Sequence, residues 1–190
     1  MPYSDPRFDD AVRSIVRNSD HTHFFDIGCG SGKFGTIARE EKGTAAILTG
    51  VEIEQAYIEQ FKLADIYDTV HNTDIIDFID ARPSFSTDFV YIGDCIEHLK
   101  KSDGIDLLHY LIYRSKQIVL VIPDKYIQYD WHGHASEAHR SVWDASDFSQ
   151  FDYTHQKDGF MNLYTVRGYL DDPDAVFDAT EDESAQVEKA

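Results

Sequence analysis

The chain has 190 residues, of which 42% are hydrophobic and 13% aromatic, a balance typical of one well-packed globular domain. Its formal net charge of −18 argues against nucleic acid as a partner, and no apolar stretch reaches the roughly 20 residues that a bilayer span needs. The N-terminal residues lack the basic and apolar regions of a secretory signal, and the two cysteines, Cys29 and Cys95, are too few for a disulfide framework. We therefore expect a cytoplasmic protein without a membrane partner.

The domain organisation follows from composition. Residues 171–190 are acidic and poor in apolar side chains, so we expect them to form a mobile, solvated tail. Residues 1–170 contain no internal repeat and no linker-like segment, and we predict that they form a single domain.

Apolar runs and helical patterns alternate along the first two thirds of the chain. The spacing of apolar residues predicts a leading helix over 6–17 and further helices over 32–42, 54–65 and 104–114, with a helical or irregular piece over 75–87. Apolar runs predict strands over 21–28, 45–54, 66–74, 88–99 and 117–123. Strands that are apolar on both faces and alternate with helices are typical of a parallel sheet covered by helices.

The pattern changes after Pro123. Residues 124–144 form a long aromatic and histidine-rich segment without a clear period, and long irregular segments in compact domains are usually functional. Residues 151–159 and 160–170 then read as two strands joined by a turn at Lys157-Asp158-Gly159. The predicted fold is therefore α/β, a Rossmann-like doubly wound sheet that is mostly parallel and ends in an antiparallel hairpin.

A glycine-rich loop follows the first predicted strand, in the stretch FFDIGCGSGKFG. A phosphate loop is excluded, because Ile27 stands where its first glycine should be and Phe34 where Ser or Thr should follow the lysine. The GxGxxG pattern of dinucleotide-binding loops is also broken, since the third glycine comes one residue early, at Gly32. The spacing that remains is Asp26-x-Gly28-x-Gly30-x-Gly32.

This spacing, followed by acidic residues at the ends of the next two strands, resembles the class I S-adenosylmethionine-dependent methyltransferases from about Phe24 to Arg167. The resemblance implies a seven-stranded core and S-adenosylmethionine as cofactor. It assigns the methionine part of the cofactor to the glycine loop, the ribose hydroxyls to Glu52 and the adenine to the end of the third strand. The residues that it implies are Asp26, Gly28, Cys29, Gly30, Gly32, Glu52, Ile53, Asp74, Ile75 and Asp94.

The simpler alternatives are that Glu52 is a solvated strand end, that Asp74 caps a helix and that the glycines form a structural turn.

The fourth predicted strand runs into Asp94-x-x-Glu97-His98. This motif is similar to the ExxEH motif of two metal-using branches of the family, the ubiquinone-pathway O-methyltransferases and the small-RNA 3′-terminal methyltransferases, which add a later histidine; His139 stands at a similar place. Asp94 departs from the motif, being one methylene shorter than Glu. We favour Asp94 as a cofactor contact and predict no metal; the alternative is a divalent ion, manganese or zinc by ligand type, among Asp94, Glu97, His98 and His139.

The predicted catalytic residues are Glu97, His98 and His139, with His139 as general base because imidazole titrates near neutral pH. For Glu97 and His98 the alternative is a structural or cofactor-pocket role. His132 and His134 are rivals in the same loop, and a solvated loop histidine is the plainer alternative. The aromatic side chains of this segment are predicted either to wall the acceptor site or to cover the core; they are Tyr126, Tyr129, Trp131 and Trp143.

Together these features predict a methyltransferase that acts on an oxygen or nitrogen of a small molecule. Two alternatives stay open: an enzyme similar to RNA 2′-O-methyltransferases that uses a divalent metal, and a non-catalytic subunit that binds the cofactor. The sequence does not indicate an oligomeric state.

Overall fold

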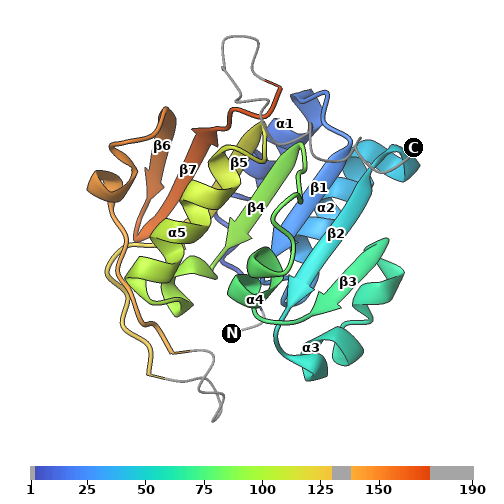
Figure 1. Ribbon diagram of the computed structural model, residues 1–190, viewed down its shortest axis with the longest axis horizontal. Coiled ribbons are helices and arrows are strands. Elements are labelled where there is room, and N and C mark those ends of the chain that lie inside the picture. Colours follow the sequence, from blue (N-terminus) through green and yellow to red (C-terminus); the bar gives the residue numbers. More distant parts are fainter. Residues whose placement is uncertain (1–2, 130–137, 172–190) are drawn as a thin grey trace, which may run out of the picture.

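The computed structural model describes residues 3–129 and 138–171 and contains a seven-stranded sheet (Figure 1). Its strands are β1 His23–Ile27, β2 Ile47–Glu52, β3 Thr69–Asn72, β4 Phe89–Gly93, β5 Gln117–Pro123, β6 Tyr153–Asp158 and β7 Met161–Arg167. Their order is β3-β2-β1-β4-β5-β7-β6, and β7 runs antiparallel to both of its neighbours. The predicted fold class is confirmed.

The register of the central strand determines where a ligand can bind. Ile27, the last residue of β1, pairs in parallel with Val51 of β2 on one side and Ile92 of β4 on the other. The carboxyl ends of these strands therefore lie at one edge of the sheet. Because the chain reverses its winding direction between β1 and β4, that edge is the topological switch point at which open α/β sheets bind ligands.

The helices form one layer on each face of the sheet (Figure 1). They are α1 Asp9–Asn18, α2 Lys33–Lys42, α3 Gln55–Gln60, α4 Ile75–Asp80 and α5 Lys101–Ile112, with short 3₁₀ turns η1 Gly43–Ala45, η2 Leu63–Asp65, η3 Ile96–His98 and η5 Ala145–Phe148. Side chains of α4 and α5 pack against one face, and those of α1 and α2 against the other. The strands are apolar on both sides for this reason.

Aromatic rings fill much of the face under α1 and α2. The Phe34 ring lies 4.3 Å from the Tyr91 ring and 5.6 Å from the Phe89 ring, nearly parallel to both. Phe34 is the second residue of α2, so this stack anchors the beginning of that helix to β4. The glycine loop before α2 is thereby held against a rigid surface.

Several predicted boundaries differ from the structure, among them the start of α1, which lies at Asp9 and not at residue 6. The helix predicted over 54–65 ends at Gln60, because Lys62 adopts a left-handed conformation (φ 49°) that lets Leu63 turn into the core. Helix α5 begins at Lys101, earlier than predicted. The hairpin turn lies one residue later than predicted, since Asp158 still pairs with Met161 and left-handed Gly159 (φ 59°) begins the connection.

Among the described residues, none of the helices combines the length and the apolar character that a membrane span requires. The predicted tail lies outside the described residues from 172 onward, as do Trp131, His132 and His134.

Candidate functional site

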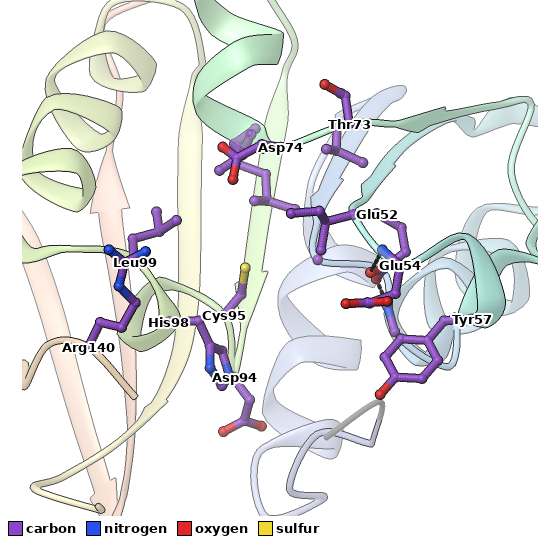
Figure 2. A pocket seen from close by; sticks show the side chains of 16 residues that line it. Glu52, Glu54, Tyr57, Thr73, Asp74, Asp94, Cys95, His98, Leu99 and Arg140 are labelled. Atoms are coloured by element: carbon purple, nitrogen blue, oxygen red, sulfur yellow. Dashed lines mark hydrogen bonds between the residues drawn. The ribbon is translucent and has the colours of Figure 1, made fainter. Parts of the chain in front are cut away.

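A cavity lies at the carboxyl edge of the sheet, enclosed by the loops after β1, β2, β3 and β4 (Figure 2). In Figure 2, Glu54 and Tyr57 lie on the opposite side of the cavity from Asp94 and Cys95. The predicted cofactor contacts that line this cavity are Gly28, Gly30, Glu52, Ile53, Asp74, Ile75 and Asp94. Residues from four separate strand ends are thus brought together as the resemblance predicted.

The glycine loop approaches the loop after β4 very closely. Gly28 has a left-handed conformation (φ 75°), and a Cβ built on it would lie 2.7 Å from Sγ of Cys95. A side chain there would therefore have to displace Cys95 and would also be strained. This contact explains why a residue without a side chain is required directly after β1.

Glu52 ties two of these loops together. One carboxylate oxygen accepts a hydrogen bond from the Gly30 N–H at 2.8 Å, and the other accepts from the Glu54 N–H at 2.9 Å. Burial raises the pKa of the Glu52 carboxyl above its usual value, and these two hydrogen bonds oppose that shift. Each carboxylate oxygen has two acceptor sites, so both oxygens keep capacity for a ligand hydroxyl.

Three predicted cofactor contacts lie behind the loop rather than in the cavity wall formed by the described residues. The Asp26 carboxylate, 3% exposed, accepts a hydrogen bond from the Tyr67 hydroxyl, which also accepts from the Gly35 N–H at 3.2 Å. The Cys29 thiol points to the Val51 carbonyl at 3.4 Å, and Gly32 is the N-cap of α2, in a left-handed conformation. Their position favours a supporting role.

Asp74 both caps a helix and lines the cavity. Its carboxylate accepts a hydrogen bond from the Ile76 N–H at 2.7 Å, which makes it the N-cap of α4. The simpler alternative, that Asp74 caps a helix, is therefore correct, but it does not describe the whole role of this residue. The two roles are compatible, because the second carboxylate oxygen is not needed for the cap.

Glu97 is the most unusual side chain of the site. It is 3% exposed, and among the described residues neither of its carboxylate oxygens has a hydrogen-bond partner. Burial and the nearby Asp94 carboxylate raise the pKa of Glu97 well above its usual value, and burial also raises the pKa of Asp94. A buried carboxyl without a partner is costly, which points to a ligand, ion or water in contact with it.

Two imidazoles lie beside this carboxyl. One ligand atom each from Glu97, His98 and His139 can be chosen so that all three lie within 4.8 Å of one another. The segment that carries His139 is held there by hydrogen bonds from the N–H groups of Arg140 (2.7 Å) and Ser141 (3.0 Å) to the Glu97 carbonyl. Asp94, the fourth member of the metal alternative, lies outside this group of three.

The protonation of His139 follows from its neighbour. Its Nδ1 lies 2.8 Å from the Tyr126 carbonyl oxygen, which can only accept, so in the neutral ring Nδ1 carries the proton and Nε2 carries the lone pair. Burial lowers the pKa of His139 below its usual value and that of His98 to about 4. Both rings are therefore neutral at pH 7.

A second cavity adjoins the first and shares Asp94 and His98 with it. Its wall includes Tyr126, Phe160 and the residues 3–6 near the start of the chain. Nothing in the sequence indicates that Phe160 or residues 3–6 line a cavity, because they belong to no recognisable motif. Asp94 and His98, which line both cavities, therefore lie where the two cavities meet.

The aromatic segment after Pro123 divides between the two roles predicted for it. Tyr126 lines the second cavity, whereas Trp143 is 1% exposed and covers the core. The Trp143 indole fits there because Gly104 has no side chain: a Cβ on Gly104 would lie 2.5 Å from the ring. The interpretation of Trp143 as an acceptor wall is wrong.

Some residues of the first cavity wall were not predicted from the sequence. They include Glu54, Tyr57, Thr73, Leu99 and Arg140. Glu54 and Tyr57 follow Glu52 closely in the sequence, and this proximity is the one weak indication that they line the cavity. Arg140 enters the wall only through the hydrogen bond of its backbone N–H to the Glu97 carbonyl.

No protein-family model and no curated protein matches the sequence of this chain. Solved structures do match its fold. The N-terminal domain of EvdMO1 with S-adenosylhomocysteine bound has a TM-score of 0.62 at 12% identity, covering 87% of this chain and 82% of that one. The plantazolicin methyltransferase BpumL in complex with S-adenosylhomocysteine has a TM-score of 0.60 at 13% identity, covering 86% of each chain.

The small-RNA methyltransferase HEN1 has a TM-score of 0.64 at 14% identity, and the match covers 87% of this chain but 26% of HEN1. The strand order and these similarities define the fold of the class I S-adenosylmethionine-dependent methyltransferases. The predicted resemblance is confirmed at the level of the fold.

Proposed function

We propose that this chain is an S-adenosylmethionine-dependent methyltransferase that acts on an oxygen or nitrogen of a small molecule. The observation that carries the proposal is the convergence of the glycine loop, Glu52, Asp74 and Asp94 on one cavity at the switch point of the sheet. Bound S-adenosylmethionine would supply an activated methyl group on its sulfonium sulfur. The protein then has to bind, align and, for many acceptors, remove a proton.

The residues divide the binding work by chemistry. Glu52 presents acceptor sites suited to a pair of ribose hydroxyls, and Asp74 with the backbone of Ile75 offers an acceptor and a donor to adenine. The N-terminus of α2, directly after the glycine loop, favours a carboxylate group.

His139 is the candidate general base, because its Nε2 lone pair belongs to a ring that lines the adjoining cavity. Tyr126 and Phe160 give that cavity an aromatic wall suited to a planar or apolar acceptor.

The cofactor assignment is tested by thermal unfolding and calorimetric titration with S-adenosylhomocysteine. At a hundred times its dissociation constant it should add about 2.7 kcal/mol, a rise on the order of 5–10 °C. Glu52→Gln should weaken binding at least about tenfold, because the side-chain NH₂ would face one of the two backbone N–H groups, that of Gly30 or that of Glu54. Glu59→Gln, an exposed change on α3, is the matched control. No binding by cofactor-free wild-type protein would overturn the proposed function.

A second candidate adds a divalent ion to the same site, and it is favoured by the Glu97 carboxyl, which has no hydrogen-bond partner in the part of the chain that the structure describes. Glu97, His98 and His139 would hold the ion, and the ion would polarise an acceptor hydroxyl. One carboxylate and two imidazoles suit manganese or zinc. RNA remains the alternative acceptor for such a site, although the net charge of −18 disfavours it.

The metal is tested by titrating chelator-treated protein with Mn²⁺ or Zn²⁺. Binding and a rise in Tm are expected for wild type and should be lost in Glu97→Gln and His139→Ala. A wild type that binds neither ion would leave His139 as a base and Glu97 as a buried neutral acid. Retention of the protein on single-stranded RNA, weakening steeply with salt, would favour the RNA alternative.

A further inference from the structure

A segment at the start of the described chain crosses the junction of the two cavities. We call residues 3–7 the strap. At one end the Tyr3 ring contacts the Phe61 ring edge-on at 5.6 Å, and at the other the Arg7 guanidinium lies 4.2 Å over the Phe160 ring. The strap therefore spans from the end of α3 to the β6–β7 hairpin, and residues 3–6 form part of the wall of the second cavity.

One lysine holds the middle of the strap. Nζ of Lys33, the first residue of α2, donates to the Ser4 carbonyl at 3.1 Å, the Asp5 carbonyl at 2.8 Å and the Asp9 carboxylate at 2.7 Å. An ammonium group has three N–H donors, so these three acceptors use all of them. The lysine that breaks the dinucleotide-loop pattern thus has a structural use in this chain.

The strap is also bonded to the wall between the cavities. The Asp5 N–H donates to Oδ2 of Asp94 at 3.0 Å, and Asp94 lines both cavities. Asp94 has a left-handed conformation (φ 45°) that is unusual for a residue with a side chain, and the hydrogen bond from Asp5 supports the orientation of its carboxylate. Lys33 supplies that support indirectly, by fixing the carbonyl of the same residue whose N–H reaches Asp94.

From these contacts we propose that Lys33 is a positioning residue: it pins the strap across the junction and so couples closure of the acceptor cavity to cofactor binding through Asp94. The inference rests on the proposed function, since Asp94 is taken to contact the cofactor. A cofactor that favours one orientation of Asp94 then favours the closed strap, and a closed strap favours the cofactor by the same factor. The coupling makes two reciprocal predictions.

The first prediction concerns access to the strap. An arginine-specific protease should cleave after Arg7 when the strap opens, because the Arg7 guanidinium is held over the Phe160 ring in the closed strap. Mass spectrometry follows the loss of residues 1–7. Saturating S-adenosylhomocysteine should slow this cleavage about fivefold in wild type, and Lys33→Met should accelerate it about fivefold without ligand.

The second prediction concerns affinity. Lys33→Met should bind S-adenosylhomocysteine several-fold more weakly, and by no more than the factor by which the ligand protects Arg7 in wild type. Lys42→Met is the matched control: Lys42 ends the same helix and its Nζ also donates to two backbone carbonyls, of Arg17 and Ser19, but far from the cavities. Asp9→Asn weakens one of the three bonds to Lys33 and should give a smaller change in the same direction.

The outcomes separate the two proposals. If wild type binds the ligand and Lys33→Met matches wild type in either readout, the coupling is wrong although the function stands. If Lys42→Met changes both readouts as much as Lys33→Met, the effect is general loss of stability and the inference fails. If wild type does not bind the ligand, the proposed function fails and the coupling fails with it.

Discussion

Asp26 illustrates how a residue of a cofactor motif can act without touching the cavity. Burial raises the pKa of its carboxyl to about 7, although the hydrogen bond from Tyr67 opposes this shift. The folded protein therefore keeps a proton on Asp26 up to about pH 7, whereas the unfolded chain loses it near pH 4. Between these values the folded state binds more protons than the unfolded state, so the free energy of unfolding falls as pH rises and levels off above pH 7.

Asp26→Asn removes this titration. The wild-type free energy of unfolding, taken relative to that of the variant, should fall by an amount on the order of 4 kcal/mol between pH 4 and 7, measured by urea unfolding. Tyr67→Phe removes the hydrogen bond that lowers the pKa of Asp26, so in that variant the decline should continue above pH 7. A difference that stays constant with pH would contradict the buried, protonated carboxyl.

Helix α4 and its cap test whether an element's stability and a ligand contact can be separated. Asp74→Ala should lose the cap and cost about 1 kcal/mol of folding free energy. Asp74→Ser keeps an N-cap oxygen on a shorter side chain, so its stability should stay close to wild type while its affinity for S-adenosylhomocysteine falls. Urea unfolding and calorimetry measure the two effects, and a Ser variant with wild-type affinity would reduce Asp74 to a cap.

The whole molecule carries a net charge of −18, and its like charges repel one another in the compact state. We expect Tm to rise as KCl increases from low concentration to about 1 M, by about 2–4 °C for each kcal/mol of repulsion that is screened. Exposed ion pairs such as Arg13–Glu40 would change Tm in the opposite direction but contribute little. A Tm that falls with salt would mean that attractive pairs outweigh the repulsion.

The features that the sequence predicted correctly depend on short stretches of chain. Apolar runs between helical patterns predict parallel strands because burial on both faces requires them, and the spacing from Gly28 to Gly32 indicates a bare loop because only glycine fits there. Glu52 and Asp74 lie at strand ends, and parallel strands bring such ends to one edge.

The remaining features depend on contacts between distant parts of the chain. His139 meets Glu97 and His98 only because two backbone N–H groups of its loop bond the Glu97 carbonyl. In the sequence, Lys33 is only the residue that breaks the dinucleotide-loop pattern, and its contact with the strap is seen only in the folded chain. Trp143 enters the core because Gly104 leaves room for its ring. A local pattern records which residues prefer burial or turns, whereas these partners are selected by the shape and hydrogen-bonding groups of segments that meet only after the sheet has formed.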